Sequence, residues 1–120
     1  MKIKRALLSV WNKDGIVELG QFLTDQNIDI LSTGGTKKVL EEAGLDITAI
    51  SSLTGNRAIM DGRVKTLHPK VFGGILADRE NPQHLHDLED LHGLEIDLVV
   101  VNFYPFVQGA VEKKLKFKEA

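Results

Sequence analysis

The feature that most constrains the fold of this chain is the alternation of short apolar runs with stretches of helical periodicity. Residues 6–10, 28–31 and 98–101 are nearly continuous apolar runs of strand length, as expected for strands that are buried on both faces. Apolar residues recur at helical spacing over residues 16–23 and again before Gly44. Strands and helices that alternate in this way form parallel βαβ units. We therefore predict an α/β fold with three layers, in which helices flank a parallel sheet.

Turn-forming residues set the expected ends of the first two helices. Asn12 or Asp14 is expected to cap the first helix through its side chain, and Asn27 is expected to end it. Gly44 is expected to end the second helix, because glycine readily adopts the left-handed conformation that follows a helix. These residues keep the connections short, as parallel βαβ units require.

The centre of the chain is less regular. Residues 46–50 are expected to form a short extended segment, and residues 51–63 a loop, because they contain the turn signals Thr-Gly-Asn and Asp-Gly. Residues 71–76 are apolar with two central glycines, so helix and strand both fit them. A stripe of leucines predicts a short helix that ends near Gly93; it consists of Leu85, Leu88 and Leu91.

Length and composition limit the classes of function. The chain has 120 residues, of which 42% are hydrophobic and 27% charged, so residues 1–120 are expected to form one globular domain. A formal net charge of −2 disfavours nucleic-acid and anionic-membrane partners. No apolar run approaches the roughly 20 residues that a membrane helix needs. The absence of cysteine excludes disulfides and Cys-based metal sites, and it fits a cytoplasmic location.

Three polar segments follow the predicted strands. They are residues 9–13, 32–36 and 102–104, and in an open parallel sheet ligands bind at this carboxyl edge. The second segment, Ser-Thr-Gly-Gly-Thr, places two glycines and several hydroxyls at the start of a helix, where backbone N–H groups can bind a phosphate. An ordinary helix-capping turn has the same composition, so both interpretations stay open here.

Residues 61–70 form a cationic segment without helical or strand periodicity. Arg63 offers a planar guanidinium, Lys65 a mobile ammonium, and Pro69 stiffens the backbone after them. Such a segment suits a phosphorylated or carboxamide substrate, but a solvated loop has the same composition. The first seventy residues also carry more cations than carboxylates, so a small anion is expected in this half.

Other polar residues carry weaker signals. His84 and His86 are two residues apart on a predicted helix, which points their rings to different faces and favours a solvated acidic surface over a metal site. His92 is interpreted as a partner of a helix C-terminal dipole. Trp11 could stack on a base or pack at the end of a strand.

Four motifs together resemble those of the amino-terminal inosine monophosphate (IMP) cyclohydrolase domain of the bifunctional purine biosynthesis proteins. In chain order they are Leu-Ser-Val with Asn-Lys at residues 8–13, Ser-Thr-Gly-Gly-Thr at 32–36, Gly-Arg-Val-Lys-Thr-Leu-His-Pro at 62–69 and Asn-Phe-Tyr-Pro-Phe at 102–106. They span nearly the whole chain. Domains of this family have a methylglyoxal-synthase-like, Rossmann-like fold with a parallel sheet flanked by helices, which agrees with the pattern of apolar runs.

The resemblance implies ring closure of 5-formamidoimidazole-4-carboxamide ribotide to IMP with loss of water. It implies a substrate-binding set of Ser9, Asn12, Lys13, Thr33, Gly34, Gly35, Thr36, Arg63, Thr66 and Asn102. The carboxamide nitrogen must attack the formyl carbon, and the developing oxyanion needs cationic or hydroxyl donors. By this argument the family motifs assign catalysis to Lys65 and Tyr104.

The resemblance also implies partners and cofactors. The expected ligand is a purine ribotide, no metal or organic cofactor is needed, and folate serves only the transformylase domain, which these residues do not include. A homodimer is expected for the full-length protein. Family members continue with Ile-Asp-Ile-Gly-Gly and Ala-Ala-Lys-Asn segments that complete the active site. Neither occurs in these 120 residues, so a domain truncated at its carboxyl end is expected.

Two alternatives share the fold. A nucleotide-sensing regulatory domain would use the phosphate turn without catalysis, but it has no evident need for the motifs at residues 62–69 and 102–106. Methylglyoxal synthase would need catalytic carboxylates at strand ends, where Asp61 is the main acidic residue near the polar segments.

Overall fold

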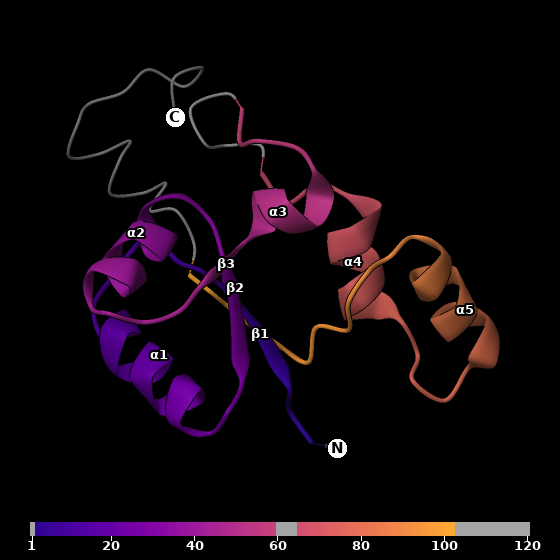
Figure 1. Cartoon of the computed structure of the whole chain (residues 1–120), viewed down its shortest axis with the longest axis horizontal. Coiled ribbons are helices and arrows are strands. Elements are labelled where there is room, and N and C mark those ends of the chain that lie inside the picture. Colours follow the sequence, from indigo (N-terminus) through magenta and orange to yellow (C-terminus); the bar gives the residue numbers. More distant parts are fainter. Residues whose placement is uncertain (1, 60–64, 103–120) are drawn as a thin grey trace.

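The computed structural model describes residues 2–59 and 65–102, which are built around a four-stranded sheet (Figure 1). All its neighbouring strands are parallel, in the order β3-β2-β1-β4. The strands are β1 (Arg5–Ser9), β2 (Asp29–Ser32), β3 (Thr48–Ala49) and β4 (Leu98–Val101). The register pairs Leu7 of β1 with Leu31 of β2 and with Val99 of β4.

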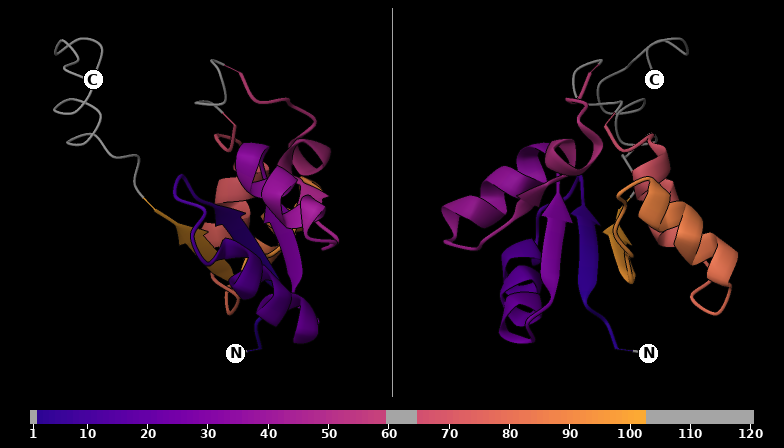
Figure 2. Two further views of the ribbon diagram at one scale, coloured as in Figure 1. Left: turned by 90° about the vertical axis from the view of Figure 1, so that its left-hand side faces the viewer. Right: turned by 45° about the vertical axis from the view of Figure 1, so that its right-hand side comes forward.

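Helices cover both faces of this sheet. In chain order they are α1 (Ile16–Asp25), α2 (Gly34–Glu42), α3 (Ile50–Thr54), α4 (Pro69–Leu76) and α5 (Pro82–Asp90). Figure 2 shows α1 and α2 on one side of the sheet and α4 and α5 on the other. The predicted α/β class, with a parallel sheet between two helical layers, is confirmed.

Consecutive strand residues point into two separate cores, which is why the strand sequences are nearly continuous in hydrophobicity. Leu8 and Ile30 pack with Ile16, Leu23 and Leu40 from α1 and α2. On the opposite face, a second core consists of Leu7, Leu31, Ile50, Val71 and Ile96. Each strand therefore contributes side chains to both layers.

The expectation of a loop over residues 51–63 was wrong at its beginning, where α3 forms a short helix. Ile50 and Thr54, one helical turn apart, are both buried against the sheet. Gly55 then adopts a left-handed φ of 77° and ends the helix. A helix of five residues is too short to show a periodic pattern, so the turn signals after it dominated the interpretation.

Residues 71–76, which fitted helix and strand equally, belong to α4. Pro69 occupies the first turn, and the His68 ring nitrogen Nδ1 accepts a hydrogen bond from the Lys70 backbone N–H at 3.0 Å. Gly74 faces the chain before β4 so closely that a Cβ atom there would lie 2.2 Å from the Leu94 carbonyl oxygen. The glycine is thus explained by helix-to-backbone packing.

The observed helix ends agree in part with the ends predicted from the sequence. Asn27 and Gly44 have positive φ values of 61° and 87°, as expected for residues that follow a helix. The expected side-chain cap of α1 was wrong: Gly15 is the N-cap and no side chain caps the helix. Asn12 Oδ1 instead accepts the Asp14 N–H at 2.9 Å, which stabilises the loop before the helix.

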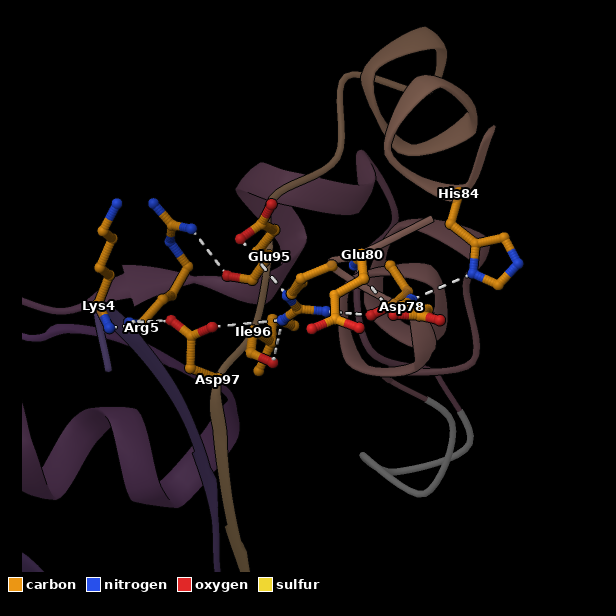
Figure 3. Close-up of polar contacts among 10 residues, drawn as sticks. Lys4, Arg5, Asp78, Glu80, His84, Glu95, Ile96 and Asp97 are labelled. Carbon is orange, nitrogen blue, oxygen red and sulfur yellow. Dashed lines mark hydrogen bonds and ion pairs between the residues drawn. The ribbon is translucent and has the colours of Figure 1, made fainter. Parts of the chain in front are cut away.

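The amino end of the sheet is closed by a charge network around Asp97 (Figure 3). Its carboxylate accepts backbone N–H groups of Lys4 at 2.9 Å and Arg5 at 3.2 Å, and the Arg79 guanidinium at 3.3 Å. Arg79 also donates to the Ile96 carbonyl at 3.0 Å. Burial raises the pKa of the Asp97 carboxyl, but these donors outweigh it and hold the pKa below its usual range.

No group of three or more potential metal ligands occurs in residues 2–59 and 65–102. His84 Nδ1 accepts the Asp78 N–H at 3.1 Å, and His86 lies 3.3 Å from the Asp90 carboxylate on the same helix. His92 adopts a left-handed φ of 56° just after α5. Over these same two stretches, no helix is both long and apolar enough to cross a membrane.

Candidate anion-binding site

The carboxyl edge of the sheet brings three segments together. They are the β1–α1 loop (residues 10–15), the turn from β2 into α2 (residues 32–36), and Asn102 directly after β4. Neighbouring parallel strands end at the same edge, and their register places Leu8 beside Ser32 and Ser9 beside Val101. Ser32 Oγ donates to the Leu8 carbonyl at 2.6 Å, which ties the ends of β1 and β2 together.

The first turn of α2 is open toward this edge. Thr33 is the N-cap residue, but its side chain makes no capping hydrogen bond, and its hydroxyl is buried without a partner. A buried hydroxyl without a hydrogen bond costs free energy. A ligand that makes a hydrogen bond to the Thr33 hydroxyl would therefore recover this cost. The first N–H groups of an α-helix have no partners within the helix and carry its positive dipole end. Together these groups form a site with positive potential.

Two lysine side chains approach the glycines at the start of α2. Gly34 has a left-handed φ of 52°, and a Cβ atom there would lie 3.8 Å from the Lys65 ammonium. A Cβ atom on Gly35 would lie 3.4 Å from Lys13 Cε and 3.7 Å from its ammonium. Two ammonium groups therefore lie within van der Waals reach of successive residues at the same helix end.

Among the described residues, Lys13 and Lys65 have no acidic partner that balances their charge. Desolvation by burial, and after it the charge of Lys65, lowers the pKa of the Lys13 ammonium below its usual value. Within residues 2–59 and 65–102, neither ammonium forms an ion pair with a carboxylate. An anion bound between Lys13 and Lys65 would remove this repulsion.

The loop that carries Lys13 is anchored from both sides. The Lys13 ammonium donates to the carbonyls of Val10 and Trp11, the latter at 3.1 Å. Asn102 Oδ1 accepts the N–H groups of Trp11 at 2.6 Å and Asn12 at 3.1 Å, and its Nδ2 donates to the Asn12 carbonyl at 2.9 Å. The loop backbone is therefore fixed where it faces α2.

One hollow adjoins the start of α2, and a second hollow shares residues with the first. The first, about 180 Å³, is lined by Thr33 and Gly34 from the turn, Ser51 from α3, and Asn56 and Lys65. The second, about 380 Å³, also contains Asn56 and Lys65 and extends past Arg57 and His68. Because the two hollows share residues, an elongated ligand could occupy both with Lys65 between its two ends.

The structure brings together several residues that the sequence singled out. Lys13, Thr33, Gly34, Gly35 and Lys65 meet at the start of α2. Thr66 is half-buried next to Lys65 along the chain, and Ser9 is half-buried at the end of β1. Arg63 and Tyr104 lie outside the described residues.

Thr36, Asn12 and Asn102 have side chains engaged with the protein itself. Thr36 Oγ1 accepts the Val10 N–H and donates to the Val10 carbonyl, both at 3.1 Å. Asn12 binds the Asp14 N–H, and Asn102 binds the loop backbone.

Sequence reasoning did not single out Ser51 and Asn56, which line the smaller hollow. Both lie in the stretch that was expected to be a loop, so no pattern placed them near the phosphate turn. Thr54 Oγ1 accepts the Asn56 N–H at 3.0 Å, which holds Asn56 just after α3. The signal that could have found them is the Thr-Gly-Asn turn itself.

The family model described as the MGS-like domain matches residues 15–120. The chain belongs to this family. The resemblance drawn from the four motifs is thereby confirmed at the level of the family. The crystal structure of ForH has a TM-score of 0.75 to this MGS-like domain at 33% identity, covering 95% of this chain and 62% of that one.

Among curated proteins, the MGS-like domain is similar to the bifunctional purine biosynthesis protein PurH of Staphylococcus aureus. The proteins of strains Newman and JH1 are each 53% identical to it over 118 residues, which is 98% of this chain and 24% of the relative. The chain thus spans about a quarter of the length of these curated relatives.

Proposed function

We propose that this MGS-like domain binds the 5′-phosphate of a purine ribotide at the start of α2 and takes part in IMP cyclohydrolase ring closure. The observation that carries the proposal is the pair of ammonium groups, Lys13 and Lys65, beside Gly34 and Gly35. The similarity to PurH proteins, which are named for purine biosynthesis, supports a purine ribotide as the ligand.

The start of α2 suits a phosphate dianion. A phosphate oxygen can accept several hydrogen bonds at once. Here the first turn of α2 offers its free N–H groups and the buried Thr33 hydroxyl, the Lys65 ammonium lines the smaller hollow, and the Lys13 ammonium approaches from beside Gly35. A phosphate would also offset the charge of Lys65, which adds to desolvation by burial in lowering the pKa of Lys13. In this proposal the phosphate lies in the smaller hollow and the base extends into the larger one.

Ring closure needs a donor near the formyl group. The carboxamide nitrogen attacks the formyl carbon, a C–N bond forms, and negative charge develops on the formyl oxygen; after proton transfers this oxygen leaves as water. A cation placed at that oxygen stabilises the transition state. Lys65 belongs to both hollows, so we assign it this role. The family motifs add Tyr104 as a further donor and Arg63 as a contact to the base.

The test is a titration of IMP followed by backbone amide chemical shifts. We expect Gly34, Gly35 and Thr33 to move first, because the phosphate binds their N–H and hydroxyl groups. Inorganic phosphate should move the same amides, whereas inosine, which lacks the phosphate, should not. A response confined to another surface would contradict the proposed site.

A further inference from the structure

We propose that Asn102 and Thr36 are positioning residues, which fix the β1–α1 loop and through it the Lys13 ammonium. The inference rests on the proposed function, because it concerns the same anion-binding site. It differs from the family assignment in one respect: these two side chains bind the protein backbone instead of the ligand.

Asn102 uses its whole amide group on the loop. Its oxygen accepts the N–H groups of Trp11 and Asn12, and its nitrogen donates to the Asn12 carbonyl. Residues more than 90 positions away in the sequence are thereby joined, so the end of β4 sets the path of the loop that follows β1. The two bonds to Asn12, at 3.1 and 2.9 Å, have ordinary hydrogen-bond lengths, and the bond from the Trp11 N–H is shorter, at 2.6 Å.

Thr36 holds the same loop from the helix side. Its hydroxyl is buried, accepts the Val10 N–H and donates its single proton to the Val10 carbonyl. A hydroxyl has only one proton to donate, so Thr36 cannot also donate from this side chain to a phosphate while that bond is kept. Its backbone N–H, at the first turn of α2, stays available for an anion.

Lys13 depends on both anchors. Its ammonium donates to the carbonyls of Val10 and Trp11, and these two residues are the ones that Thr36 and Asn102 bind. If the loop moved, the ammonium would leave Gly35, gain solvent and move away from the charge of Lys65. If Asn102 and Thr36 position the loop, substituting them should change the titration of Lys13 in the ligand-free protein. If they contact the ligand directly, the titration of Lys13 without ligand should stay the same.

The experiment follows the Lys13 side chain and phosphate binding in the variants Asn102→Ala, Thr36→Val and Thr36→Ser. The Lys13 titration is read from its ¹³Cε chemical shift without ligand, and inorganic phosphate is titrated separately. We expect Asn102→Ala and Thr36→Val to raise the Lys13 midpoint toward that of an ordinary lysine. Asn102→Ala removes three loop hydrogen bonds and Thr36→Val removes two, but each variant keeps the other anchor. Phosphate affinity should therefore fall about three- to tenfold, the equivalent of one net hydrogen bond. Thr36→Ser keeps the hydroxyl and should match the wild type.

Thr24→Val is the matched control, since Thr24 lies in α1 away from the loop, and it should change neither readout. The proposal is overturned if phosphate affinity falls in Asn102→Ala and Thr36→Val while the Lys13 midpoint stays at the wild-type value, because that result means direct contact. It is also overturned if Thr36→Ser shifts Lys13 as far as Thr36→Val does. If the wild-type chain binds no phosphate, the proposed function fails, and the Lys13 midpoint still decides the positioning role.

Discussion

The two ends of the parallel sheet differ in the groups that surround their charged side chains. At the amino end, Asp97 is surrounded by donors, with two backbone N–H groups and a guanidinium within 3.3 Å. At the carboxyl end, the ammonium groups of Lys65 and Lys13 lie near Gly34 and Gly35 at a positive helix end, where the buried Thr33 hydroxyl has no partner among the described residues. The first arrangement lowers the pKa of an acid and stabilises its charge; the second lowers the pKa of a base and destabilises its charge.

Because of this difference, we expect the amino end of the sheet to contribute to fold stability and the carboxyl end to ligand binding. Charge that is fully compensated inside the protein stabilises the fold, whereas charge left uncompensated in a hollow favours an external ion of opposite sign. Substitutions at the amino end should therefore change unfolding but not ligand binding. Substitutions at the carboxyl end should do the reverse.

The largest effect is expected for Lys65→Ala on the rate of ring closure, measured in a domain that also contains the Ile-Asp-Ile-Gly-Gly and Ala-Ala-Lys-Asn segments that the family resemblance assigns to the active site. Loss of an oxyanion donor typically lowers turnover on the order of 10²–10³-fold. The rate is measured spectrophotometrically with the formamido ribotide as substrate. Lys70→Ala is the control, since Lys70 lies on α4 outside both hollows and should keep the wild-type rate. Equal rates for the two variants would remove Lys65 from the chemistry.

The next largest effect is expected on the free energy of unfolding, for a substitution at the amino end of the sheet. Asp97→Ala removes the acceptor of two backbone N–H groups and one of the two carboxylate partners of Arg79, which keeps Glu95 and the Ile96 carbonyl. It should lower the free energy of unfolding by about 2 kcal/mol. Urea denaturation measures this loss. Asp29→Ala provides the matched control: its carboxylate is 73% exposed and 3.8 Å from Arg5, so the change should cost well under about 1 kcal/mol. Phosphate binding should be unchanged in both variants, and a loss of binding in Asp97→Ala would contradict the separation of the two ends.

A smaller effect is the acid sensitivity that Asp97 confers. Its pKa is lower in the folded than in the unfolded state, so its stabilisation is present above the unfolded pKa and is lost as the pH falls through the folded pKa. Unfolding free energies measured from pH 6 downward should therefore fall more steeply for the wild type than for Asp97→Ala. Parallel curves would show that other carboxylates carry the acid response.

The sequence predicted the parts of this comparison that depend on local pattern. The apolar runs of β1, β2 and β4 were sufficient to predict that the polar segments meet at the carboxyl edge, because topology alone brings those strand ends together. The glycine-rich turn made an anion site there one of two open interpretations. Composition singled out Lys65 as part of a cationic segment but left a solvated loop equally open, since no periodic pattern fixes a loop residue in space. Its catalytic role was assigned through the family resemblance. The hydrogen bonds of Asn102 could not be predicted, because its partners lie about 90 residues away in the sequence.

Two features of the fold also required tertiary information. The five residues of α3 form a helix because Ile50 and Thr54 are buried, a cause that lies in packing against the sheet. Gly74 in α4 is required by the approach of the Leu94 carbonyl, twenty residues later in the chain. Neither contact leaves a local signal.

The last prediction concerns Lys13 and the pH dependence of phosphate binding. Lys13→Met removes the ammonium but keeps an unbranched side chain, and it should weaken binding of inorganic phosphate about tenfold, the equivalent of one hydrogen bond to a charged group. Lys38→Met is the control. Lys38 lies on the exposed side of α2, so this substitution should leave binding nearly unchanged. Because the pKa of Lys13 is lowered in the free protein, wild-type affinity should begin to fall with rising pH before an ordinary lysine loses its proton. In Lys13→Met this part of the decline should be absent. Retention of the same decline in the variant would assign it to Lys65 and remove Lys13 from the anion site.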